Sequence, residues 1–190
     1  MVDLYDEAVV EKIRSFIPKN SSITVASPNS TEEVIIKIKE GSISFPVIFI
    51  RPGNFSFKGG RSFSDGLFGE FVKKTEDGRL LYLQADAIKL VYQIGVLATS
   101  KADSVNLIRE ILFKLRKRPR ITIMVPFGLD EQFNFSVHQL GDIEFSHSSD
   151  SFMESGILHT SLAPIEINGA RLFQVNSQLP QHINPVLGAD

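Results

Sequence analysis

Apolar residues recur along this chain with two spacings, every three or four positions as in a helix and every second position as in a strand. The first segment follows the helical spacing. From Leu4 to Ile17 apolar residues recur every three or four positions, which gathers them on one side of a helix. Acidic residues near its start complement the positive end of a helix dipole, and Pro18 ends it. The expected apolar face contains Val9, Val10, Ile13, Phe16 and Ile17.

Short runs rich in β-branched residues follow, and these are typical of strands. We expect strands at Ile23–Ala26, Val34–Ile38, Pro46–Ile50 and Leu80–Leu83, with a turn at Glu40–Ser42. The clearest alternation of the chain runs from Ile88 to Ala98, where every second residue is apolar and predicts a further strand.

A second helix is expected between Lys101 and Arg118. Ser100 and Asp103 have the spacing of a capping box, and Pro119 ends the segment. Its apolar stripe contains Val105, Ile108, Ile111, Leu112 and Leu115. Because a buried strand at Ile121–Val125 follows, residues 88–125 are interpreted as a β-α-β unit.

The rest of the chain is rich in strand patterns. Phe133, Phe135 and Val137 alternate, Gly141-Asp142 is a turn candidate, and Ile143 with Phe145 resumes the alternation. Asn168-Gly169 lies between apolar residues, which predicts a hairpin. Residues 177–190, which contain two prolines, are expected to form an irregular C-terminal tail.

The segment Arg51–Phe71 combines glycines and serines with large aromatic residues. The glycines and serines argue against a regular core element, whereas the aromatic residues argue against simple disorder. Long loops of this kind are usually functional. We expect an extended loop or arm at residues 51–71 whose phenylalanines contact a neighbouring subunit or another partner protein; these are Phe55, Phe57, Phe63, Phe68 and Phe71.

Composition narrows the classes of function. The 190 residues fit one domain spanning residues 1–190, and 43% are hydrophobic, enough for a core. A net charge of −2 argues against a global polyelectrolyte binder. The absence of cysteine excludes disulfides, thiolate metal sites and cysteine nucleophiles. No apolar run approaches the roughly 18 residues that span a bilayer, so no membrane partner is expected.

A local excess of positive charge stands in "FKLRKRPR" at residues 113–120. Its basic residues are Lys114, Arg116, Lys117, Arg118 and Arg120. They complement the negative end of the preceding helix, so one interpretation is a solvated helix end. The mixed charge of the first half of the helix argues against sequence-specific DNA reading. Contact with phosphates, or with acidic residues of a neighbouring subunit, stays open, and in that case the patch has little role in folding the monomer.

Candidate chemistry is sparse. The four histidines show no paired ligand spacing, so neither metal nor cofactor is expected. Ser146, His147, Ser148 and Asp150 are neighbours in one polar stretch, whereas a catalytic triad needs residues that converge from different elements. "FKGGRS" lacks the ending of a phosphate-binding loop. We therefore expect no enzymatic activity.

The run "YQIGVLATSKADSVNLIREILFKLRKRPRITIMVP" resembles the middle of tail terminator proteins from the neck of tailed bacteriophages. The shared pattern is a strand, a capped helix with an exposed basic end, and a buried strand; Ala98–Asp103 stands where that family has its helix cap. Later β segments also fit, so the resemblance covers roughly residues 80–175. Two features depart from a minimal terminator, namely the 51–71 segment and the C-terminal tail.

The resemblance implies an α+β fold, with a mostly antiparallel twisted sheet flanked by two main helices. It also implies a virion structural protein, made in the host cytoplasm, that forms a homo-oligomeric, six-fold ring. Such a ring caps the tail tube and joins it to the head connector, with non-specific contact to packaged DNA left open. The alternatives are another tail, baseplate or head-completion subunit, and a sequence-independent nucleic-acid-binding module.

Overall fold

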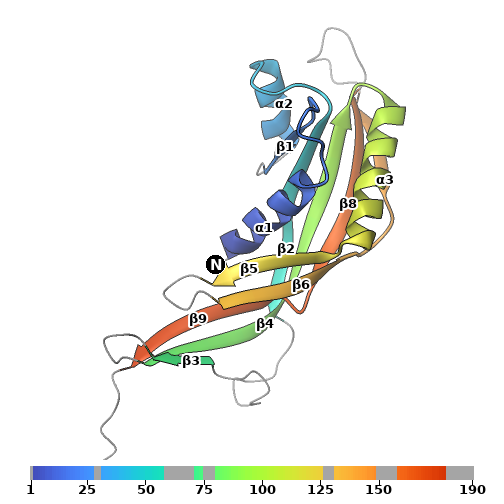
Figure 1. Cartoon of the computed structure of the whole chain (residues 1–190). Coiled ribbons are helices and arrows are strands. Elements are labelled where there is room, and N and C mark those ends of the chain that lie inside the picture. Colours follow the sequence, from blue (N-terminus) through green and yellow to red (C-terminus); the bar gives the residue numbers. More distant parts are fainter. Residues whose placement is uncertain are drawn as a thin grey trace, which may run out of the picture.

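The computed structural model describes residues 2–27, 31–57, 71–74, 80–125, 131–148 and 158–178. Its elements run in the order α1 (Val2–Arg14), β1 (Thr24–Ala26), α2 (Thr31–Lys39), β2 (Val47–Phe57), β3 (Phe71–Lys74), β4 (Leu80–Ala98), α3 (Lys101–Lys117), β5 (Arg120–Val125), β6 (Glu131–Gln139), β7 (Glu144–Ser148), β8 (Leu158–Asn168) and β9 (Arg171–Gln178) (Figure 1). This is an α+β fold, as predicted, and the described residues form three helices on a curled, mixed sheet.

Strand β4 is the centre of the sheet. The main path is β1-β2-β4-β8-β6-β5, with β3 and β9 on β4 and β7 on β8. Among the strands that the structure describes, only β1 and β2 pair in parallel; the other pairs are antiparallel. Strands β4 and β5, which flank α3, are separated by β8 and β6. The segment that was interpreted as a β-α-β unit therefore does not form adjacent parallel strands.

The two edges of β4 are each occupied by two strands that follow one another. On one edge β2 pairs with residues 88–97 and β3 with residues 80–83; on the other, β8 pairs with residues 90–98 and β9 with residues 80–87. The first half of β4, with β3 and β9, forms an arm that extends away from the helices (Figure 1).

Each long edge carries an irregularity where the arm meets the body. The register of β2 against β4 shifts between Pro52 and Phe55. Between β8 and β9, Ile167 pairs with Leu90 and Arg171 with Ala87, so one edge has one residue more than the other. Bulges of this kind bend a strand and increase its twist. Two bulges at one level of β4 account for the change of direction there.

The hairpin predicted at Asn168-Gly169 is wrong. Strand β9 continues in the direction of β8 along the same edge of β4 and does not turn back on β8. Gly169 has a φ of +72°, which a type I′ turn requires and which the glycine of a one-residue bulge also requires. The Asn-Gly signal therefore identified the backbone conformation correctly and the topology incorrectly.

The strand predicted at Val34–Ile38 is helix α2. Alternation would place residues 34, 36 and 38 on one face, whereas a helix places 34 and 38 together and turns 36 away. Val34 is fully buried and Ile36 is 53% exposed, which matches the helix. Lys37 Nζ lies 2.7 Å from Glu33 Oε1, one helical turn away, and this ion pair also stabilises the helix. Val34 packs with Val47, Phe49 and Leu97 in a small second core.

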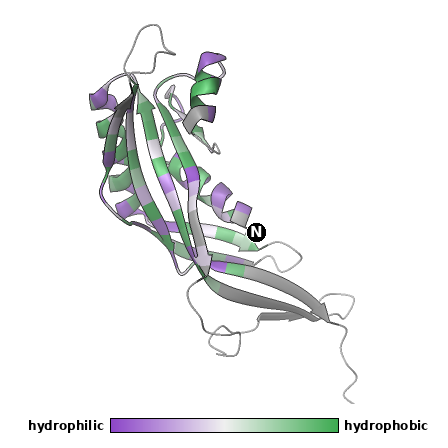
Figure 2. Ribbon diagram, turned by 180° about the vertical axis from the view of Figure 1, so that it is seen from behind, coloured by the Kyte–Doolittle hydropathy of each residue, from purple (hydrophilic) through white to green (hydrophobic). Residues whose placement is uncertain are grey.

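Helices α1 and α3 lie on the other face of the sheet and bury the main core. The alternate residues of β4 from Ile88 to Val96 point into it, and green segments recur along the strands in Figure 2. Four residues of the predicted α3 stripe are buried, namely Ile108, Ile111, Leu112 and Leu115, whereas Val105 is half-buried. The predicted cap is confirmed, since Ser100 Oγ accepts a hydrogen bond from the Asp103 amide at 3.4 Å.

Two buried tyrosines attach α1 to the sheet. Tyr5 Oη donates to the carbonyl of Arg171 and accepts from its amide, both at 2.8 Å. Tyr92 Oη donates to Asp6 Oδ1 at 2.6 Å. Burial raises the pKa of Tyr5 to about 12, against a smaller opposing effect of Arg171. Burial, followed by the hydrogen bond to Asp6, raises the pKa of Tyr92 well above its ordinary value.

The tyrosines predict loss of stability at high pH. Both pKa values are higher in the folded state, so the stability they contribute is complete below about pH 10 and falls as the pH rises toward 12. We expect the melting temperature to drop between about pH 10 and pH 12, and to drop less in a Tyr5→Phe/Tyr92→Phe variant. An equal drop in both proteins would show that neither hydroxyl is linked to folding.

The pairing of Gly95 with Phe49 predicts a specific cost for added volume. A Cβ at Gly95 would lie 2.0 Å from Phe49 Cζ, so we expect Gly95→Ala to lower the free energy of unfolding by about 1–3 kcal/mol. Gly141→Ala is the matched control, because its Cβ would meet Pro164 Cγ at 3.5 Å, an ordinary contact. Urea denaturation measures both variants. Equal stabilities would contradict the packing of Phe49 over Gly95.

Candidate functional site

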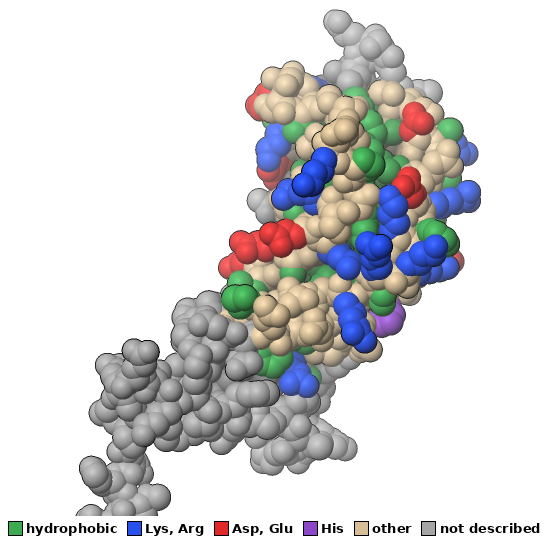
Figure 3. All heavy atoms as spheres, viewed as in Figure 1, with side chains coloured by type: hydrophobic (Ala, Val, Ile, Leu, Met, Phe, Trp, Pro, Cys, Tyr) green, Lys and Arg blue, Asp and Glu red, His purple; other side chains and the backbone are tan. Residues whose placement is uncertain are grey.

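The basic residues predicted as a patch lie where α3 ends and β5 begins. Arg116, Lys117, Arg118 and Arg120 are exposed, whereas Lys114 is partly buried. Figure 3 shows Lys and Arg side chains gathered over α3. Arg118 is the C-cap of α3, and its amide donates hydrogen bonds to the carbonyls of Lys114 and Leu115. The basic residues are therefore distributed around the last turn of the helix.

Lys114 joins α3 to the end of α1. Its Nζ donates to the Phe16 carbonyl at 2.8 Å and lies 2.6 Å from Glu110 Oε1. The Phe16 carbonyl follows the last turn of α1, where carbonyl groups have no partner within the helix. Lys114 therefore has an intramolecular role in addition to its surface charge.

The other basic residues are held more loosely. Arg116 Nη2 donates to Gln139 Oε1 at 3.2 Å, and Gln139 in turn donates to the Gly141 carbonyl at 2.6 Å. Lys117 Nζ lies 4.4 Å from the ring centroid of Phe113, a cation–π contact. Phe113 itself is 57% exposed.

The structure adds one lysine from α1 to this charged region. Lys12 Nζ lies 5.5 Å from the ring centroid of Phe16. Burial lowers the pKa of Lys12, and the positive charge of Arg118 lowers it further. No pattern in the sequence linked residues 12 and 118, because their proximity depends on how α1 and α3 pack on the sheet.

The predicted aromatic contacts are placed only in part. The backbone of Phe55 and Phe57 belongs to β2, and Phe71 begins β3. Phe63 and Phe68 lie outside the described residues. Residues 51–57 of the segment predicted as a loop are thus in strand β2, and Ser177 and Gln178 of the predicted tail end strand β9.

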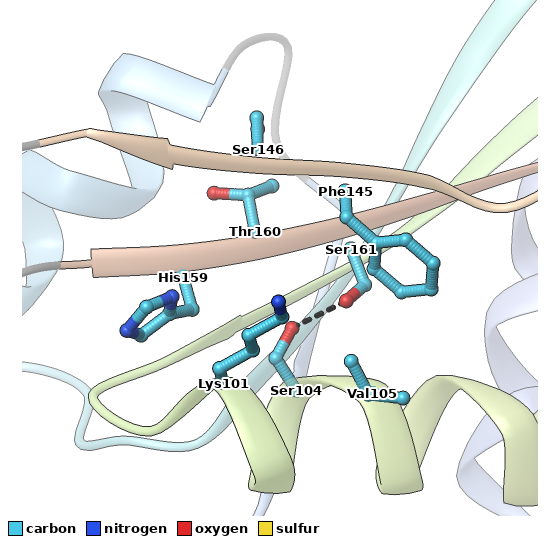
Figure 4. A pocket seen from close by; sticks show the side chains of 8 residues that line it. All are labelled: Lys101, Ser104, Val105, Phe145, Ser146, His159, Thr160 and Ser161. Atoms are coloured by element: carbon cyan, nitrogen blue, oxygen red, sulfur yellow. Dashed lines mark hydrogen bonds between the residues drawn. The ribbon is translucent and has the colours of Figure 1, made fainter.

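A pocket of about 340 Å³ lies between the first half of α3 and strands β7 and β8 (Figure 4). Ser104 and Ser161, both buried, share a hydrogen bond of 2.6 Å, and Ser104 Oγ also donates to the Val96 carbonyl at 3.3 Å. Through these hydrogen bonds the hydroxyls of Ser104 and Ser161 attach α3 to β4 and β8. Lys101 and His159 are at the rim of the pocket in Figure 4, with no dashed bond to either serine.

The polar run at residues 146–150 is divided by the structure. Ser146, His147 and Ser148 lie in β7, and Asp150 is outside the described residues. Within the described ranges no three His, Asp or Glu residues come together as metal ligands. No helix in the described part of the chain has the length and apolar character needed to cross a membrane.

Comparison with solved structures gives a likeness of fold. No family model matches the sequence, and no curated protein matches it. Among solved structures, the chain is similar to the sheath/tube terminator of an extracellular contractile injection system (PVC), determined by cryo-EM in the extended state. The TM-score is 0.50 with 11% sequence identity, over 94% of this chain and 58% of the terminator chain. This chain thus has a tail terminator-like fold and spans less than two thirds of that protein's length.

The contact of Lys114 with α1 predicts a difference between neighbouring lysines. Lys114→Met removes the donor to the Phe16 carbonyl, so we expect a loss of about 0.5–1.5 kcal/mol in the free energy of unfolding. Lys117→Met removes an exposed charge and should change it by less than about 0.5 kcal/mol. Urea denaturation of both variants is the measurement. A cost at Lys117 that matched or exceeded the cost at Lys114 would contradict the assignment.

Proposed function

We propose that this chain is a structural subunit of a ring that closes the end of a tail tube, in a tailed phage or a related contractile particle. The observation that carries the proposal is the likeness of fold to a sheath/tube terminator over 94% of the chain. The pattern of strand, capped helix and strand at residues 88–125 also supports the proposal, because its sequence resembles the middle of tail terminator proteins.

The proposed assembly is homo-oligomeric and six-fold, with the tail tube on one side and the sheath or head connector as further partners. The subunit is made in the host cytoplasm and belongs to the finished particle. The phenylalanines of residues 51–71 are proposed contacts with a neighbouring subunit or tail protein. In this role no catalytic activity is proposed for the chain.

The basic residues at the end of α3 favour one second candidate, a sequence-independent contact with nucleic acid. Exposed Arg and Lys side chains neutralise phosphates, and such binding weakens steeply with salt. In a neck ring the same residues can face packaged DNA, so the two functions are compatible.

The mass and shape of the purified protein test this proposal. We expect rings in negative-stain images and, by light scattering, a mass of about 127 kDa for six copies of a 21.2 kDa chain. If the protein is a monomer at every concentration and binds DNA in a salt-sensitive way, the ring proposal is contradicted and the nucleic-acid-binding function is supported. Rings that fail to bind purified tail tubes but bind baseplates or heads would identify another tail or head-completion subunit.

A further inference from the structure

The exposed side of α3 combines an apolar residue with positive charge. Phe113 is 57% exposed, more than any other large hydrophobic residue among those described. Arg109, Arg116 and Lys117 stand one turn away from it on either side, and all three are exposed. Within the described part of the chain, Arg109 has no hydrogen bond or ion pair. We name these four residues the α3 ridge.

The exposed side of α1 carries the opposite charge. Glu7 and Glu11 are one turn apart and exposed, while Tyr5, Val9 and Ile13 on the other side are buried in the core. Neither side-chain carboxylate has a hydrogen bond or ion pair within the described residues, in contrast to that of Asp6, which accepts a hydrogen bond from Tyr92. In Figure 3 acidic side chains lie over α1 and basic side chains over α3, on the same face of the molecule.

No ion pair joins Glu7 or Glu11 to the α3 ridge among the described residues of one chain, so the two complementary surfaces are available to meet between copies. A contact in which one surface of a subunit binds a different surface of the next is heterologous, and it generates a ring when the rotation closes. We propose that the α3 ridge of one subunit binds Glu7 and Glu11 on α1 of the next subunit. This inference rests on the proposed ring and identifies the interface that builds it.

The chemistry of the ridge suits such a contact. Phe113 provides an apolar centre, and the surrounding charges form a polar rim, the usual arrangement of a protein interface. Arg116 and Lys117 then face carboxylates that have no partner within their own subunit. Attraction between exposed charges is screened over about 8–10 Å at 0.1–0.15 M salt, so the ring should dissociate as the salt concentration rises.

The test is a charge exchange between two variants. In the first variant, Glu7→Lys/Glu11→Lys makes α1 basic; in the second, Arg116→Glu/Lys117→Glu makes the ridge acidic. Each alone places like charges at every contact, so we expect the ring peak in size-exclusion chromatography to be lost. In an equimolar mixture the two variants alternate, every contact pairs opposite charges again, and the ring peak should return.

The controls separate charge from position and folding. Glu40→Lys/Glu144→Lys makes the same change of charge at exposed positions just after α2 and at the start of β7, and Lys101→Glu changes the other end of α3; both should assemble like the unmodified chain. Circular dichroism verifies that every variant is folded. Phe113→Ser should lower assembly without changing its salt dependence.

The outcomes distinguish this inference from the proposed function. Rings that persist in both charge variants would overturn the α1–α3 contact and leave the ring proposal standing. An unmodified chain that stays monomeric would overturn both. Loss of DNA binding in the second variant, with assembly unchanged in both, would assign the ridge to nucleic acid instead.

Discussion

The fold depends on the burial of one face of strand β4 beneath two helices. The residues from Ile88 to Val96 on that face belong to one buried core with residues of α1 and α3, which are almost a hundred positions apart in sequence. Three polar contacts fix the helices in place: Tyr5 to the Arg171 backbone, Tyr92 to Asp6, and Ser104 to Ser161. Lys114 then joins the two helices at their ends. Since the described part of the chain has no buried side-chain polar atom without a partner, these contacts satisfy their groups fully.

The same packing determines which charges face outward. On α1, burial of Tyr5, Val9 and Ile13 in the core leaves Glu7 and Glu11 exposed. On α3, burial of Ile108, Leu112 and Leu115 leaves Arg109, Phe113 and Arg116 exposed. The exposed charges of α1 and α3 are thus a consequence of how the helices are buried. Beyond the body, the paired bulges beside β4 direct an arm of three strands away from the helices (Figure 1). A subunit of this form offers separate surfaces to several neighbours, as a ring at the end of a tube requires.

The sequence predicted the elements whose periodicity was unambiguous: α1, the second half of β4, and α3 with its cap. It failed where two structures share one local signal. The β-branched run at residues 34–38 suits a strand or a helix, and only the exposure of Ile36 decides between them. Likewise Asn168-Gly169 is compatible with a hairpin or with a bulge. The structure has the bulge, because β9 pairs with β4 and not with β8. For the candidate site, the basic residues were visible in the sequence, whereas the bond of Lys114 to Phe16 and the proximity of Lys12 to Arg118 arise only from tertiary packing.

The central claim is that this subunit stands at the end of a tail tube. The most direct measurement is its position in intact particles, by electron microscopy with gold-labelled antibodies against the chain. The account predicts label at one end of the tube, where the tube meets the head or the sheath ends. Label along the whole tube, label on the baseplate, or particles that lack the chain altogether would contradict it.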